Sequence, residues 1–225
     1  MKKINKYTYL FVFLMMIVAA CNEPITEFGF EGSFSGKIVD QSGNIVAGDI
    51  TSGGFVVEAL GENDQVAMVL RIKGDGTFAN NKLYPQVYTV TVKGPVTTFP
   101  PVSIDLTGNK TVVQDFVVTP FLTVSAPILN GSATSTEIKV NYNIVENGSY
   151  IASTRQLYCS NIPYPNASTG SGTGYATKIV TLSAKQGTAM ITGLTAGTKY
   201  FIRVGAKATG ATAFNYSDQL IVTTP

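Results

Sequence analysis

Residues 193–206 read GLTAGTKYFIRVGA and give the clearest indication of the fold. Its first half is rich in glycine and threonine, which is typical of a turn. In its second half the residues Tyr200, Ile202, Val204 and Ala206 occupy every second position. This period of two predicts a β-strand with one buried face and one exposed face. Phe201 would then lie on the exposed face.

The same alternation recurs along most of the chain, and no segment has a helical pattern. Turn residues separate these segments about every ten residues, which is typical of β-sandwiches. The sequence therefore predicts an all-β fold with two tandem antiparallel β-sandwiches, residues 32–118 and 121–225, divided at Thr119-Pro120. The other alternating segments are Phe55-Val57-Ala59, Met68-Leu70-Ile72, Tyr88-Val90-Val92, Val102-Ile104-Leu106 and Ile138-Val140-Tyr142-Ile144.

The C-terminal half resembles the fibronectin type III domain. Residues 193–200 match the leucine, turn and tyrosine of its signature, and residues 217–225 match its last strand. The resemblance implies that Tyr200 forms a tyrosine corner, in which the hydroxyl bonds to nearby backbone. Two positions depart from the family pattern: Ala196 replaces a proline of the turn, and Tyr142 replaces the core tryptophan.

The N-terminal half resembles the carboxypeptidase-regulatory-like, or transthyretin-like, domain. The matching segments are 36–40, 43–46, 74–78 and 83–90. One departure is Gln86-Val87, which replaces the usual glycine before Tyr88. Such domains are usually spacers or scaffolds, so the resemblance implies a fold and not a binding site. Asp40 and Asp75 are interpreted as turn residues, an interpretation favoured over a calcium site.

Residues 1–20 have the pattern of a secretory signal peptide. A basic start is followed by an unbroken apolar run, residues 10–20, which is too short for the about 20 residues that span a bilayer. Val18-Ala19-Ala20-Cys21 resembles the lipobox of bacterial lipoproteins, which implies acylation of Cys21 and a lipidated tether over residues 21–31. We expect an outer-membrane, lipid-anchored protein, with the cell surface favoured over the periplasmic face. An ordinary signal peptide with a chance cysteine is the alternative.

Composition excludes several classes of function. The chain of 225 residues is only 13% charged and carries a net charge of +2, and without Lys2, Lys3 and Lys6 the net charge is −1. No strong positive field remains to favour nucleic acid. The chain has no histidine, which excludes histidine-dependent triads and histidine-ligated metals. No catalytic residue, metal site or cofactor is predicted, and a carboxylate-only glycosidase is the less favoured alternative. Cys159 is predicted to be a buried structural thiol.

The segment 161–177 is the best candidate for a recognition surface. It is rich in glycine, serine, threonine and proline, and loops of this length are often functional. Sugars are bound by aromatic rings and by planar polar side chains. For each tyrosine, packing against the sandwich is the competing interpretation. The candidate ligand-binding residues are Tyr164, Tyr175, Asn161, Asn166, Tyr150 and Arg155, with Phe99 a weaker candidate.

The whole arrangement resembles the two-domain lipoproteins of unknown function from Bacteroides-type bacteria. These commonly accompany a TonB-dependent transporter and its glycan-binding lipoprotein partner. The resemblance implies a non-catalytic accessory role in glycan binding and uptake, with polysaccharide and these two proteins as partners. The alternative is a structural scaffold or adhesin-like protein that binds another surface protein, for which an exposed Phe201 would provide an apolar contact.

Overall fold

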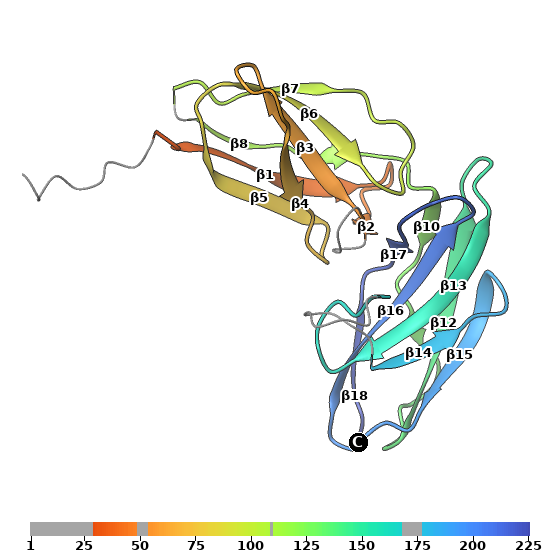
Figure 1. The fold of residues 1–225 in the computed structure, drawn as a ribbon. Coiled ribbons are helices and arrows are strands. Elements are labelled where there is room, and N and C mark those ends of the chain that lie inside the picture. Colours follow the sequence, from red (N-terminus) through yellow and green to blue (C-terminus); the bar gives the residue numbers. More distant parts are fainter. Residues whose placement is uncertain (1–28, 49–53, 109, 168–176) are drawn as a thin grey trace, which may run out of the picture. The chain divides into compact units, whose positions relative to one another are not determined.

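The structure is a computed structural model that describes residues 29–48, 54–108, 110–167 and 177–225. The predicted signal peptide, Cys21 and Tyr175 lie outside these ranges. Residues Glu31–Pro225 form one compact unit. Its described part consists of strands and turns without a helix, which confirms the all-β fold class (Figure 1). Accordingly, no helix in the described ranges is long and apolar enough to cross a membrane.

The N-terminal half forms two four-stranded sheets. The first has the order β5-β1-β8, with β9 also paired to β1, and the second has the order β4-β3-β6-β7. Pairing is antiparallel except where β8 and β9 run parallel to β1. The bounds are β1 (Gly32–Val39), β3 (Val56–Gly61), β4 (Met68–Arg71), β5 (Thr77–Leu83), β6 (Val87–Lys93), β7 (Val102–Asp105), β8 (Thr111–Val113) and β9 (Phe116–Val117).

These two sheets share one hydrophobic core. The alternating residues of β3 and β6 point into it, and Val57 and Val90 are fully buried. Phe34, Phe78 and Phe116 contact one another with ring centroids 5.1 to 6.2 Å apart. Such aromatic pairs stabilise a core beyond the area that they bury. The alternation in the sequence therefore predicted the buried face of these strands.

The C-terminal half forms a second pair of sheets around a second core. One sheet has the order β10-β12-β11, with β15 paired to β12. The other has the order β14-β13-β16-β17-β2, with β18 paired to β16. The bounds are β2 (Ala47–Gly48), β10 (Leu122–Val124), β11 (Ile128–Leu129), β12 (Glu137–Glu146), β13 (Ala152–Ser160), β14 (Lys178–Thr181), β15 (Gln186–Thr192), β16 (Lys199–Ala208), β17 (Asn215–Tyr216) and β18 (Leu220–Thr223).

The strand predicted from residues 199–206 is β16, at the centre of its sheet. Tyr200, Ile202, Val204 and Ala206 are all buried in the second core, as their alternation predicted. The Tyr200 hydroxyl accepts a hydrogen bond from the Thr195 N–H at 3.0 Å. This bond to backbone five residues upstream confirms the predicted tyrosine corner.

The other face of β16 is also buried, contrary to the prediction for Phe201. Phe201 is only 8% exposed, and the Lys199 ammonium lies 5.3 Å from the centre of its ring. The next residue on this face, Arg203, is 1% exposed. Because both faces of this central strand are covered, Phe201 offers no exposed apolar surface for a protein partner.

Candidate functional site

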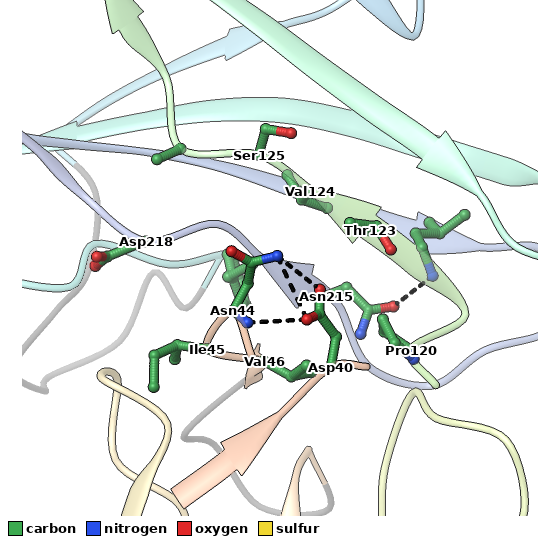
Figure 2. A pocket seen from close by; sticks show the side chains of 13 residues that line it. Asp40, Asn44, Ile45, Val46, Pro120, Thr123, Val124, Ser125, Asn215 and Asp218 are labelled. Carbon is green, nitrogen blue, oxygen red and sulfur yellow. Dashed lines mark hydrogen bonds between the residues drawn. The ribbon is translucent and has the colours of Figure 1, made fainter. Parts of the chain in front are cut away.

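A cavity of about 320 Å³ lies where residues from both halves of the compact unit meet (Figure 2). This volume is near the lower end of the about 300–1,000 Å³ typical of ligand pockets. Strand pairing helps to hold its walls together, because β2 from the first half adds to the second half's sheet through Ala47↔Tyr216 and Gly48↔Asn215. The lining residues are Asp40, Asn44, Ile45, Val46, Pro120, Leu122, Thr123, Val124, Ser125, Ala126, Asn215, Tyr216 and Asp218.

One wall is the turn that follows β1. The Asp40 carboxylate accepts hydrogen bonds from the backbone N–H groups of Ser42 and Asn44 at 2.8 and 2.9 Å. The Asn44 side-chain amide also donates to this carboxylate, as Figure 2 shows. Burial alone would raise the pKa of Asp40, but these hydrogen bonds outweigh it and lower the pKa below 3.8. The turn therefore presents a fixed negative charge and the side-chain amide oxygen of Asn44.

The floor of the cavity is built around Asn215. Its side chain is 2% exposed and uses both ends: the amide oxygen accepts from the Leu122 N–H at 3.1 Å, and the amide nitrogen donates to the Pro95 carbonyl at 3.0 Å. A buried asparagine with both ends bonded fixes the backbone that it joins. Asn215 therefore positions the start of β10, which forms the opposite wall.

That opposite wall is the segment 122–126, in which polar and apolar side chains follow one another. Thr123, Val124 and Ser125 all line the cavity, and Ser125 is exposed. The segment is fixed by backbone and side-chain bonds: the Ser125 N–H donates to the Asn143 carbonyl at 3.0 Å, and the Asn147 amide donates to the Thr123 hydroxyl at 2.9 Å. These hydrogen bonds fix the positions from which Val124 and Ser125 line the cavity.

The last wall is β17 and the residues after it. Tyr216 is 3% exposed, and its hydroxyl accepts from the Ala167 N–H at 2.9 Å. The guanidinium carbon of Arg203 lies 4.7 Å from the centre of this ring. The Arg203 Nε donates to the Ser217 carbonyl at 2.9 Å. Asp218 follows at the exposed edge of the cavity.

The chemistry of this cavity suits binding. Apolar surface comes from Ile45, Val46 and Val124, and hydrogen-bonding groups come from Asn44 and Ser125. A few placed polar groups on an apolar wall are typical of small-molecule and sugar sites. Within the described ranges, no group of three or more histidine, cysteine or acidic residues is arranged to hold a metal ion.

Tyr164 and Asn166, two of the predicted ligand-binding residues, lie beside the Tyr216 wall. The Tyr164 ring packs on Gly74, where an added Cβ would lie 2.5 Å from the ring, and the Arg203 guanidinium carbon is 5.7 Å from its centre. Burial raises the pKa of Tyr164, helped by Asp75 and Asp218 and opposed by Arg203. Asn166 is 2% exposed. Both therefore take part in internal packing.

The backbone at Tyr164 supports the same conclusion. Its φ of 57° is in the left-handed region, which is uncommon for residues other than glycine. The N–H of Tyr164 donates to the Gln219 side chain at 2.8 Å. This bond and the packing of the ring hold the residue in a conformation that it would otherwise adopt rarely.

The other predicted residues do not gather around the cavity. Tyr150 stacks on Phe121 with ring centroids 3.8 Å apart. Arg155 in β13 donates from Nη1 to the Ala152 carbonyl at 2.7 Å, and its Nε is buried without a hydrogen-bond partner. Asn161 is exposed, and Tyr175 lies outside the described residues. A glycan site over 161–177 stays a prediction.

The cavity residues had no signal in the sequence that would have grouped them. Asp40 and Asn44 have the pattern of an ordinary turn, and the hydrogen bonds confirm that they form one. Asn215 and Asp218 lie just before the last strand, more than 170 residues further along the chain. The pairing of β2 with β17 brings the first and last of these segments together, and the bonds of Asn215 to Leu122 and Pro95 add the segment between them.

A second hollow, of about 570 Å³, lies between the end of β12 and the turn before β15. Its lining includes Glu146 and Lys185, which form an ion pair at 2.7 Å. The same carboxylate also accepts from the Ala152 N–H at 3.0 Å. Its charged groups already bond to each other and to the backbone, so the first cavity is the better candidate site.

No protein-family model and no curated protein matches the chain. Solved structures do match it along most of its length. A DUF3823 family protein from Bacteroides ovatus has a TM-score of 0.69 and 18% identity, with 86% of this chain and 99% of that chain covered. A DUF3823 family protein from Parabacteroides merdae has a TM-score of 0.69 and 18% identity, with 85% and 98% covered.

A third structure is named "putative carbohydrate binding protein from Bacteroides uniformis". It has a TM-score of 0.65 and 19% identity, and 87% of this chain and 100% of that chain are covered. At this level of identity the likeness is one of fold. The chain therefore has the all-β fold of these Bacteroides-type proteins over nearly the whole length of each of them.

Proposed function

We propose that this protein is a non-catalytic, lipid-anchored outer-membrane protein that binds glycan and assists its uptake. The observation that carries the proposal is the cavity, in which Asn44, Ser125 and Asp218 accompany the apolar side chains of Ile45 and Val124. Sugar rings present hydroxyl groups at their edges and C–H groups on their faces. A wall of this mixed kind can contact both.

The comparisons and the leader support the same proposal. The fold is shared with a Bacteroides uniformis protein whose name describes carbohydrate binding. The lipobox-like sequence before Cys21 provides an anchor, since each buried methylene of an acyl chain contributes about 0.8 kcal/mol. The partners in this proposal are a TonB-dependent transporter and its glycan-binding lipoprotein, to which the captured glycan would pass.

A binding screen tests the glycan part of the proposal. The chain from Asn22 onward contains the whole compact unit Glu31–Pro225 and is run by affinity gel electrophoresis through a panel of polysaccharides. We expect at least one polysaccharide to retard it, with no reducing ends released during prolonged incubation. The absence of retardation by every polymer would contradict glycan binding, and release of reducing ends would contradict a non-catalytic role.

Labelling of whole cells tests the anchor. With radiolabelled palmitate, we expect label on the full chain and none on the Cys21→Ala variant, which should leave the membrane fraction. Cys159→Ala is the matched control, because this thiol is buried and should not carry lipid. Label that persists in Cys21→Ala would contradict acylation at this position.

Two tyrosine substitutions compare the loop with the cavity. If residues 161–177 hold the glycan, Tyr175→Ala should weaken the binding found in the screen at least about tenfold. Tyr164→Ala is less specific, since it also removes packing against Gly74 and Arg203. Unchanged affinity in Tyr175→Ala would leave the cavity as the candidate site.

The outer face of the β11-β12-β15 sheet favours a second candidate function, docking of a protein partner. Ile128 is 68% exposed and Met190 is 48% exposed. The two lie on opposite sides of β12, since Ile128 pairs with Asn141 of β12 and Met190 pairs with Lys139 of the same strand. A scaffold role predicts that Met190→Glu abolishes a crosslink to a surface protein in intact cells. Crosslinking that is unchanged in this variant would contradict the use of this face.

A further inference from the structure

We infer that the cavity selects uncharged sugar residues and excludes uronates and sulfated sugars. This inference rests on the proposed glycan function and specifies its ligand class. It is carried by the charged groups of the lining: among the lining residues that the structure describes, these are the carboxylates of Asp40 and Asp218, with no lysine or arginine. An anionic sugar in this cavity would meet like charges and no basic group to pair with.

Asp40 is a fixed part of this negative surface. Its carboxylate is held by the backbone N–H groups of Ser42 and Asn44 and by the Asn44 amide, so it cannot rotate away from the turn. The same hydrogen bonds keep its pKa below 3.8, and the group is therefore ionised at neutral pH. A sugar carboxylate or sulfate would have to be placed against a charge that does not move.

Asp218 extends the negative surface to the exposed edge of the cavity. Its Oδ1 accepts from the Gln219 N–H at 2.7 Å, which orients the carboxylate. Because Asp218 is exposed, its field is screened by salt more than that of a buried group. Discrimination against anionic glycans should therefore be strongest at low ionic strength.

Arg203 does not supply the missing positive charge. It is 1% exposed and is not among the lining residues, and its guanidinium carbon lies 4.7 Å from the centre of the Tyr216 ring. Its Nε is bonded to the Ser217 carbonyl, and its Nη2 lies 3.4 Å from the Gly74 carbonyl. It therefore cannot reach a ligand anion directly while the wall is intact.

The volume of the cavity limits how much of a glycan it holds. About 320 Å³ is near the small end of ligand pockets, which suits one or two sugar rings and not a long chain. A short segment must then satisfy most of its polar groups inside the cavity. A single charged substituent on such a segment would accordingly decide between binding and exclusion.

Paired polysaccharides and one charge reversal test this inference. The chain from Asn22 onward is run at low salt through neutral polymers (starch, galactomannan, xyloglucan, arabinogalactan) and anionic ones (polygalacturonate, alginate, chondroitin sulfate, heparin). The neutral polymer that retards it most is also used after oxidation of its C6 hydroxyls to carboxylates. We expect the oxidised form to bind at least about tenfold more weakly, and Asp218→Lys to recover most of this loss.

Glu62→Lys is the matched control, because it changes the net charge equally at an exposed residue that does not line the cavity. Equal retardation by neutral and oxidised polymer, or equal recovery in Glu62→Lys and Asp218→Lys, would overturn the charge selection and leave glycan binding in place. Retardation by the anionic polymers alone would also overturn the charge selection and leave glycan binding in place. Retardation by none of the polymers would contradict the proposed function together with this inference.

Discussion

At the scale of single residues, Tyr200 fixes a crossing of the second sandwich through one hydrogen bond. Tyr200→Phe keeps the buried ring and leaves the Thr195 N–H without the hydroxyl that accepts it. Loss of such a bond costs about 1–2 kcal/mol. We expect urea unfolding to show that the free energy of unfolding falls by this amount in Tyr200→Phe.

Tyr150→Phe is the control for this measurement. Tyr150 contributes the face of its ring, stacked on Phe121, and the substitution leaves that ring unchanged. We expect Tyr150→Phe to lower the free energy of unfolding by less than about 0.5 kcal/mol. An equal loss of unfolding free energy in both variants would show that the hydrogen bond of Tyr200 does not stabilise the fold more than an ordinary tyrosine hydroxyl does.

Cys159 provides a second prediction at this scale. It is fully buried, and burial raises the pKa of its thiol to about 12, with Lys178 opposing the shift. The reactive thiolate is therefore scarce at pH 8. The chain from Asn22 onward, in which Cys159 is the only cysteine, should react with a disulfide reagent only after unfolding in guanidinium chloride. Full labelling of the native chain within minutes would contradict this burial.

Single residues were predictable where their environment is local. The burial of Cys159 followed from its strand, and the corner at Tyr200 followed from the resemblance of residues 193–200 to the fibronectin type III signature. Tyr164 and Asn166 were predicted as ligand-binding residues from the composition of their loop. The structure packs Tyr164 against Gly74, and it buries Asn166 next to Ala167, whose N–H donates to the Tyr216 hydroxyl; Gly74 and Tyr216 both come from segments distant in sequence.

At the scale of elements, the packing of β13, β16 and β17 determines the shape of the Tyr216 wall. Gly205 in β16 leaves space for two rings: an added Cβ would lie 2.6 Å from the Tyr216 ring and 2.7 Å from the Tyr158 ring. Both rings are buried, so neither can move freely. The glycine is required here by space and not by its backbone angles.

Gly205→Ala should therefore destabilise the fold and disturb the cavity together. Overpacking of this kind costs about 1–3 kcal/mol. We expect the free energy of unfolding in urea to fall by this amount. We also expect the glycan that retards the parent chain to retard this variant less. Thr223→Ala, on the exposed side of β18, is the control and should change neither quantity. Parent-like stability in Gly205→Ala would show that the rings relax without cost.

Strands were predictable because apolar residues at every second position indicate which face of a strand is buried. This worked for β3, β6, β12 and β16, whose alternating residues fill the two cores. It was wrong for Phe201, since alternation describes one face and does not record what covers the other. The two strands β12 and β16 show this limit: both alternate, but the outward face of β12 is largely exposed and that of β16 is buried.

At the scale of the whole molecule, the compact unit Glu31–Pro225 brings together segments that the sequence keeps apart. The cavity is lined by residues 40–46, 120–126 and 215–218. The all-β class and the sandwich cores were predictable from patterning within each half. The cavity was not, because it depends on β2 pairing with β17 and on Asn215 bonding to Pro95 and Leu122.

Glycan binding in this cavity is tested most directly by blocking the cavity. Ser125→Trp places a large ring at an exposed lining residue, and Ser103→Trp makes the same change on the exposed face of β7, away from the lining. Affinity gel electrophoresis with the polysaccharide that retards the parent chain compares the two. We expect the affinity to fall at least about tenfold in Ser125→Trp and to stay parent-like in Ser103→Trp. Parent-like affinity in both variants would contradict binding in the cavity.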